Sequence, residues 1–305
     1  MAEKINQSLS VDSETAGLRL DACLAEQMPE ISRSRWQKMI DDGLVKVNGS
    51  SYRANRKLRI GDVVTWDVPE DKPEEMVPEQ ISLSILHEDD AILVLNKPPG
   101  LVVHPAAGNE TGTLVNALLH HDPVFRTLER SGIVHRLDKD TSGVLVVAKS
   151  QVAMTELQRQ FKSRETEKEY LALVWGRLPD QGRIVTWIGR HPVHRQKMAV
   201  LETAGREAVS NYETLERFSE VSLVRIRIET GRTHQIRVHM AHLGHPVLGD
   251  RVYGRGRRSN SLPRPERQML HAYRLGFTHP ASRKWLSFEA PMFEDMRQML
   301  ESLRM

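Results

Sequence analysis

The sequence is poor in the features that mark secreted and membrane-spanning proteins. Cys23 is its single cysteine, so no disulfide can form within the chain, and we expect a packed thiol in a reducing compartment. No uncharged apolar run reaches the roughly 18 residues that a transmembrane helix needs, so none is expected. The N-terminus also lacks the apolar core of a signal peptide. We therefore expect a cytoplasmic protein that does not bind membranes.

Aromatic residues are also scarce, at 5%, and positive and negative charges almost balance, with a net charge of +3. The chain has 305 residues, of which 39% are apolar and 27% charged. This composition supports an ordinary globular core and predicts two domains, or one large domain with a small companion. A pI near 9.0 indicates a polyanionic partner only weakly, so the local clustering of charge matters more than the total.

The pattern along the chain divides it into four stretches. Residues 1–16 are polar and are expected to be disordered, and residues 17–68 have the pattern of a small α/β unit, in which residues 57–68 are expected to form a final pair of strands. Residues 69–80 carry three prolines and five acidic residues, which is typical of a linker. Residues 81–305 form the larger domain.

The larger domain contains both strand and helix patterns. We expect strands at 91–97, 144–149, 170–176 and 222–229, and helices at 113–121, 151–162, 233–243 and 292–303. In the last of these strands, Val224, Ile226 and Ile228 alternate with Arg225 and Arg227, a period of two that predicts a half-buried strand. Because strands and helices do not alternate regularly, the fold class is α+β with a mixed, mainly antiparallel sheet.

Basic residues cluster in the small N-terminal unit. Arg33, Arg35 and Lys38 lie in or near one predicted helix, and Arg56 and Lys57 follow an Asn-Gly turn. Such a cluster either binds nucleic-acid phosphates or is a solvated charged face. The stretches GLRLDACLAE, SRSRWQKMIDDGLVKVNG and LRIGDVV resemble the S4 RNA-binding module, and this resemblance favours RNA.

Residues 133–143, IVHRLDKDTSG, place several charges between two apolar runs. Asp138 and Asp140 would repel each other on one face of an extended segment, and Arg136 and Lys139 can offset that repulsion. A carboxylate held at a strand edge beside a guanidinium can act as a nucleophile or base. It can equally be a structural ion pair, and the residues alone leave both readings open.

Four histidines in residues 230–246, His234, His239, His242 and His245, invite a zinc interpretation. No HExxH motif is present, and the spacing does not bring three imidazoles to one helix face, so we expect no metal. Arg237 lies in the same mostly apolar helix and would need a carboxylate partner if buried.

Ordered blocks in the larger domain carry a resemblance to a known family. They are NKPPGLVVHP (96–105), GIVHRLDKDTSG (132–143), EKEYLALVWG (167–176), TGRTHQIRVHMAHLGHPVLGD (230–250) and LHAYRLGFTHP (270–280). In this order they closely resemble the RluA family of pseudouridine synthases. With an S4-like unit in front, the chain is most similar to the D-type branch, which acts on large-subunit ribosomal RNA.

The resemblance implies an isomerase that converts uridine in RNA to pseudouridine and needs no cofactor. The implied substrate is large-subunit (23S-type) ribosomal RNA or a precursor 50S particle, in the stem-loop that bridges to the small subunit, and we expect a monomer. The alternatives are a synthase acting on other ribosomal or transfer RNA uridines, or a non-catalytic RNA-binding ribosome-assembly factor.

The family match also implies roles for single residues. Asp138 matches the catalytic aspartate, Arg237 the arginine that pairs with it, and Tyr170 the aromatic residue that packs on uracil and is a candidate for the late proton removal. Because the target base must leave its stack, Arg136 is expected to fill the vacated space. Leu137 and Ile236 are expected to form apolar walls of the uracil pocket.

Two basic loops could extend an RNA-binding track. Residues 190–197 include Arg190, Arg195 and Lys197, and residues 251–267 are rich in Arg, Gly and Pro. Either loop could instead be a solvated surface segment.

Overall fold

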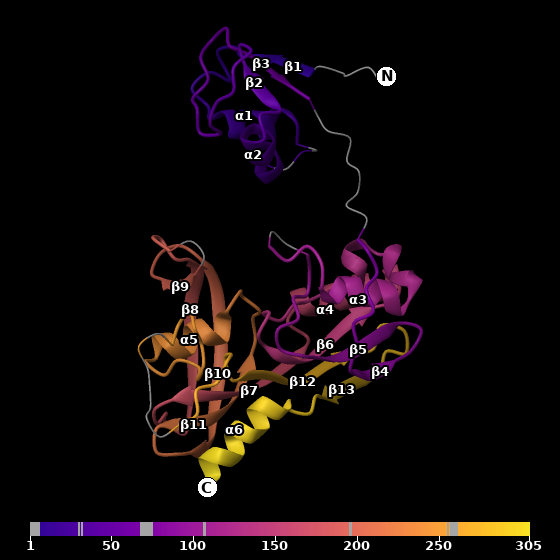
Figure 1. Cartoon of the computed structure of the whole chain (residues 1–305), viewed down its shortest axis with the longest axis vertical. Coiled ribbons are helices and arrows are strands. Elements are labelled where there is room, and N and C mark those ends of the chain that lie inside the picture. The colour runs from indigo at the N-terminus through magenta and orange to yellow at the C-terminus, as the bar shows by residue number, and fades with distance from the viewer. Residues whose placement is uncertain are drawn as a thin grey trace. The chain divides into compact units, whose positions relative to one another are not determined.

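The computed structural model describes residues 7–29, 31, 33–67, 76–105, 108–194, 197–254, 256 and 262–305, with the side chain of Ser34 left out. The chain divides into two compact units, Met1–Glu75 and Met76–Met305. Each unit has its own sheet and its own apolar core (Figure 1).

In the part that the structure describes, the N-terminal unit packs two helices on a three-stranded antiparallel sheet. Its elements are β1 (Gln7–Ser10), α1 (Leu20–Gln27), α2 (Arg33–Asp41), β2 (Val45–Val47) and β3 (Val63–Trp66), and the strand order is β1-β3-β2. Trp36 and Trp66 meet edge to face in the core, with ring centroids 5.6 Å apart. Cys23 is fully buried there, as expected for a packed thiol.

Two expectations for this unit are wrong. Residues 7–16, predicted to be disordered, contain β1, which pairs with β3, and a turn in which the Asp12 carboxylate accepts hydrogen bonds from Thr15. The segment 57–68, predicted to hold a pair of strands, supplies β3 alone among its described residues. In both places the apolar pattern is too short to indicate which strand pairs with which.

The described residues of the larger unit form one sheet of ten strands. Its strands are β4 (Ile85–Glu88), β5 (Ile92–Lys97), β6 (Ser142–Ala148), β7 (Glu167–Trp175), β8 (Gln181–Arg190), β9 (Met198–Leu201), β10 (Arg206–Arg217), β11 (Val221–Ile228), β12 (Leu270–Thr278) and β13 (Trp285–Glu289). Its helices are α3 (Leu114–His121), α4 (Gln151–Lys162), α5 (Gln235–His242) and α6 (Glu294–Arg304), with short 3-10 turns at Pro123–Arg126 and Glu129–Gly132.

The strand order is β4-β5-β6-β12-β7-β11-β10-β8-β9, with β13 paired to β12. Among the described strands, only β6 and β12 pair in parallel, which confirms the predicted mixed, mainly antiparallel sheet. Gly143 lies at this parallel contact with φ 117°, and a Cβ atom there would meet the Ala272 carbonyl oxygen at 2.2 Å. A residue without a side chain is therefore required where the two strands meet.

The helices cover different parts of the sheet (Figure 1). Side chains of α3 and α4 join the core of β5 and β6, and Met296, Met299 and Leu300 of α6 pack on β7 and β11. Helix α5 contacts β9 and β10. No helix among the described residues is long and apolar enough to span a lipid bilayer.

The predicted helices and strands of the larger unit are all present, with ends shifted by a few residues. Val224, Ile226 and Ile228 share one buried face of β11, as the period of two predicts. Strands β8, β10 and β12 were not predicted, because their polar and charged residues interrupt the apolar alternation.

Candidate active site

One cavity in the larger unit brings together six residues singled out from the sequence. Asp138, Tyr170, Arg237, Arg136, Leu137 and Ile236 all line it. They come from the loop before β6, from β7 and from the first turns of α5. The cavity holds about 100 Å³, well below the roughly 300–1,000 Å³ of sites that enclose drug-sized ligands. Its size suits a single small ring.

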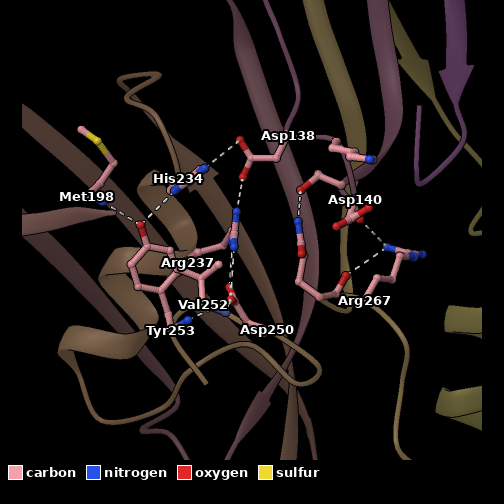
Figure 2. Close-up of polar contacts among 12 residues, drawn as sticks. Asp138, Asp140, Met198, His234, Arg237, Asp250, Val252, Tyr253 and Arg267 are labelled. Carbon is pink, nitrogen blue, oxygen red and sulfur yellow. Dashed lines mark hydrogen bonds and ion pairs between the residues drawn. The ribbon is translucent and has the colours of Figure 1, made fainter. Parts of the chain in front are cut away.

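Arg237 is the central cation of this cavity and contacts two carboxylates (Figure 2). Its Nη1 donates to Asp138 Oδ2 at 2.9 Å, while Nε and Nη2 donate to the two oxygens of Asp250 at 2.6 and 3.1 Å. Burial alone would lower the pKa of Arg237, but hydrogen bonds and attraction from Asp250 and Asp138 raise it above its ordinary value. The guanidinium is therefore permanently charged and fixed in direction. Asp138 and Asp250 are the carboxylate partners expected for a buried arginine.

Asp250 was missed from the sequence as a functional residue. Its side chain is fully buried, and Oδ1 also accepts hydrogen bonds from the backbone N–H groups of Val252 and Tyr253 at 2.8 and 2.9 Å. These bonds hold the carboxylate so that it can orient Arg237. The only signal was its place at the end of the 230–250 block, where nothing local distinguishes it from a turn residue.

The loop that carries Asp138 is held through its backbone. The buried Lys97 Nζ donates to the carbonyl oxygens of Pro98, Leu101 and Lys139 at 2.7, 3.0 and 3.0 Å. Burial lowers the pKa of Lys97 to about 7. Thr141 N–H donates to the Asp138 carbonyl oxygen at 3.1 Å and closes the turn.

A second brace comes from residues just before β12. Arg267 Nη1 donates to the Asp140 carbonyl oxygen at 3.2 Å (Figure 2), and Gln268 Nε2 donates to Thr141 Oγ1 at 3.3 Å. Arg267 is buried and forms two hydrogen bonds with Asp295. Within the predicted basic loop 251–267, Arg267 thus makes contacts inside the protein.

Tyr170 reaches the cavity from β7 and packs against two of the apolar cores. Burial, and then the charge of Asp138, raise the pKa of its phenol. The hydroxyl group therefore stays protonated at neutral pH, beside the carboxylate.

The remaining predicted pocket residues differ in exposure. Arg136 is exposed, and the described part of the chain offers it no ion-pair partner. Leu137 and Ile236 are buried, at 5% exposure each, and form apolar parts of the cavity wall. Two residues before Leu137, His135 stacks on Phe161 and its Nε2 accepts from Val146 N–H at 3.0 Å.

Comparisons with known proteins agree with this geometry. Residues 91–242 match the family model described as RNA pseudouridylate synthase, and residues 18–64 match that of the S4 domain. "Ribosomal large subunit pseudouridine synthase D" of Xylella fastidiosa is 46% identical over 98% of this chain and 93% of its own length. The chain belongs to the RNA pseudouridylate synthase family. It is therefore an isomerase that forms pseudouridine in RNA.

Other members of the family support the same assignment. "Ribosomal large subunit pseudouridine synthase D" of Pseudomonas aeruginosa is 44% identical over 100% of this chain and 98% of its own length. The solved structure of "Human RNA Pseudouridylate Synthase Domain Containing 1" is 30% identical and covers 74% of this chain and 96% of its own, with a TM-score of 0.56. The predicted family and fold are thus confirmed.

The four histidines of the synthase's 230–246 block serve different sites. His239 is fully buried between Ser210 and Thr186, with 2.9 Å contacts to both hydroxyl groups, and burial lowers its pKa to about 4. His245 Nδ1 lies 2.7 Å from the Trp175 carbonyl oxygen. Within the described residues no three His, Cys, Asp or Glu side chains are grouped as metal ligands.

A basic groove adjoins the cavity of the synthase. Arg190, Arg206 and Arg232 line it, and it shares Gly231, Arg232 and Thr233 with the cavity. Burial, and then the nearby Arg206 and Arg164, lower the pKa of Arg232 against the opposing attraction of Glu207. Arg206 and Arg232 were missed from the sequence because they are far from Arg190 along the chain.

Three residues near this groove were predicted to contact RNA, and they differ in where they lie. Arg190 is exposed and lines the groove. Lys197 Nζ donates to the Val252 carbonyl oxygen at 3.2 Å. Arg195 lies outside the described residues.

The predicted RNA contacts of the N-terminal unit also make structural contacts. Arg33 donates to the buried Asp21 at 3.1 Å. Burial would raise the pKa of Asp21, but hydrogen bonds from Arg19, Gln37 and Arg33 lower it to about 2. Arg56 lies 3.6 Å from Asp62 and stacks on the ring of Tyr52. Lys38 and Lys57 are exposed, and Arg35 is half-buried.

Proposed function

We propose that this enzyme converts uridines of large-subunit ribosomal RNA to pseudouridine, with Asp138 as the catalytic carboxylate. The observation that carries the proposal is the Arg237–Asp138 ion pair in the wall of a cavity that Tyr170 also lines. The ribosomal substrate is supported by the relatives named for the large subunit, which match almost the whole chain. We also propose a cytoplasmic site of action, because these relatives are named for the large ribosomal subunit.

A cavity of this size can take a single base but not a base within a stack. The target uridine must therefore swing out of the RNA, which costs a few kcal/mol. Arg136 is exposed at the cavity rim, and we propose that its side chain occupies the vacated space. Leu137 and Ile236 then contact the faces or edges of the uracil ring.

The isomerisation breaks the bond from N1 of uracil to C1′ of ribose and forms a bond from C5 to the same C1′. A proton leaves C5 and N1 gains one, so no outside group or electron is needed. We propose that the Asp138 carboxylate acts on the ribose or the base to allow bond cleavage. Arg237 orients this carboxylate and supplies the neighbouring positive charge.

Tyr170 fits two parts of the reaction. Its ring provides a flat surface on which the detached uracil can turn. Its hydroxyl group stays protonated because burial and Asp138 raise its pKa. It can therefore accept the proton from C5 of uracil only if it gives up its own proton at the same time. We propose both roles for this residue.

The RNA outside the cavity is proposed to follow the basic groove of Arg190, Arg206 and Arg232. In the N-terminal unit, exposed Lys38 and Lys57 are the proposed phosphate contacts, with Arg33, Arg35 and Arg56 beside them. Arg33 and Arg56 already have acidic partners, so RNA would compete for them. The proposed substrate is the stem-loop bridging to the small subunit, in free RNA or a precursor 50S particle.

The first experiment maps pseudouridine by chemical labelling and primer extension on large-subunit RNA from cells lacking the protein. Wild-type protein and Asp138→Asn are each returned to these cells. We expect the missing modifications to return only with the wild type, while both proteins bind the RNA equally. Modification restored by Asp138→Asn would overturn the catalytic assignment, and unchanged ribosomal RNA would redirect the search to transfer RNA.

A further inference from the structure

His234 has a left-handed backbone conformation, unlike the other non-glycine residues that line the described cavity. It lies at the N-terminus of α5 with φ 56° and ψ 19°, a left-handed conformation, and its side chain does not cap the helix. Few side chains adopt this region, and such strain is concentrated at functional sites. The conformation directs the imidazole toward Asp138 (Figure 2).

The hydrogen bonds of Tyr253 determine which imidazole nitrogen carries the proton. The Tyr253 hydroxyl oxygen accepts from Met198 N–H at 2.9 Å and lies 2.9 Å from His234 Nδ1. Of the described residues, only His234 offers this hydroxyl an acceptor for its own proton. Tyr253 therefore donates to Nδ1, and the ring hydrogen of a neutral His234 lies on Nε2.

His234 Nε2 faces Asp138 Oδ1 across a gap of 3.9 Å. This is too long for a direct hydrogen bond. Burial lowers the pKa of His234 against the opposing effect of Asp138, with Arg237, Asp250 and Arg136 as the other charged groups nearby. The cavity wall thus presents a neutral N–H donor next to a carboxylate acceptor.

We propose that His234 Nε2–H and Asp138 Oδ1 together bind the 2′-hydroxyl group of the target nucleotide. A single oxygen can lie about 2.8 Å from both atoms, and a hydroxyl group is both donor and acceptor at that one atom. A uracil carbonyl group can accept from His234 but cannot donate to Asp138, and a phosphate would be repelled by the carboxylate. This inference rests on the proposed role of Asp138 and adds a means of distinguishing RNA from DNA.

The test uses the RNA fragment identified by the mapping experiment, made with ribose or 2′-deoxyribose at the target uridine. A matched fragment carries the 2′-deoxyribose at the next nucleotide. The affinity of each fragment is measured for wild type, His234→Asn and Tyr253→Phe. Asparagine tolerates the left-handed backbone of residue 234, and thermal unfolding checks that the variant folds.

We expect wild type to bind the target-deoxy fragment about 10- to 100-fold more weakly than the ribose fragment, because the fragment loses one hydrogen bond from neutral His234 and one to the Asp138 carboxylate. In His234→Asn the ratio is expected to fall about 3- to 10-fold but to stay above one, because the 2′-hydroxyl keeps its contact with Asp138. In Tyr253→Phe, which no longer fixes the tautomer of His234, the ratio is expected to fall by less. The neighbouring deoxy position is expected to affect all three proteins equally. An equal ratio in wild type and His234→Asn, or no discrimination by wild type, overturns the inference.

The proposed function fails separately from this inference. If wild type does not modify the all-ribose fragment, the role of Asp138 and the inference that rests on it both fall. If it modifies the fragment but the His234→Asn ratio is unchanged, only the assignment of His234 falls.

Discussion

Asp250 binds the Nε and Nη2 edge of Arg237 and leaves Nη1 to Asp138. Asp250 therefore supports Asp138, the proposed catalytic carboxylate, through the shared guanidinium. A buried arginine with a single carboxylate could turn in its site, whereas one held at two nitrogens has a fixed direction.

Asp250→Asn is expected to slow pseudouridine formation at saturating RNA by roughly 10- to 100-fold, the effect of displacing a positioned catalytic group by about 1 Å. RNA affinity is expected to stay near the wild-type value. Single-turnover rates measure the first effect and filter binding the second. Asp180→Asn is the control, since Asp180 is 89% exposed beside Arg217. A wild-type rate for Asp250→Asn would contradict the supporting role.

Tyr170→Phe is expected to bind RNA normally but to form little pseudouridine, because it keeps the ring and loses the hydroxyl group. Burial and Asp138 raise the pKa of Tyr170, so the wild-type rate should show no titration of this group between about pH 7 and pH 10. Rate–pH profiles test both points. The control is Tyr212→Phe, at a buried strand tyrosine outside the cavity. Full activity of Tyr170→Phe would show that the Tyr170 hydroxyl is not needed and would leave stacking as the only role of this residue.

Arg206→Gln is expected to weaken RNA binding and to reduce the slope of log affinity against log salt by about 0.7–0.9, the effect of one lost phosphate contact. Arg206 lines the groove but not the catalytic cavity. Affinity measured across a salt series gives the slope. The control is Arg297→Gln, at an exposed ion pair of α6. An equal slope for both variants would show that RNA does not bind in the groove.

His239→Gln is expected to lose less folding stability than wild type when the pH falls into the mildly acidic range. Burial lowers the pKa of His239 to about 4, against about 6.5 in an unfolded chain. Between these pH values the unfolded chain binds a proton that the folded protein does not, so falling pH favours unfolding.

Chemical denaturation at pH 7 and at pH 4.5 measures this effect. At pH 7 the variant is expected to be about 1–3 kcal/mol less stable, because the hydrogen bonds of His239 with Ser210 and Thr186 are altered. At pH 4.5 the difference from wild type is expected to shrink. A constant difference at both pH values would show that His239 does not titrate in this range.

The sequence identified the residues whose types are unusual for their surroundings. Asp138 between apolar runs, and Arg237 in an apolar helix, both stand out because buried charges need partners, and they prove to be partners of each other. Asp250 and Arg267 did not stand out, because each lies in a polar turn where a charged residue is ordinary. Their importance depends on contacts with segments far away in the chain.

Strand order was equally hard to predict. Alternation of side chains indicates that a segment is a strand but not which strand it pairs with. Nothing in residues 270–278 indicates that β12 lies between β6 and β7. Similarly, β1 pairs with β3, and the short, polar sequence of β1 does not predict this pairing.

The place of β12 in the sheet has a consequence for biosynthesis. β6, which follows Asp138, and β7, which carries Tyr170, are made early but are joined only through a strand that begins at Leu270. While the chain is being synthesised, Asp138, Tyr170 and Arg237 can all have been added without forming an active site. Because such distant pairings form late in folding, the enzyme acquires its activity only when nearly all of the chain has been made, and a premature stop before β12 yields a protein unable to modify RNA.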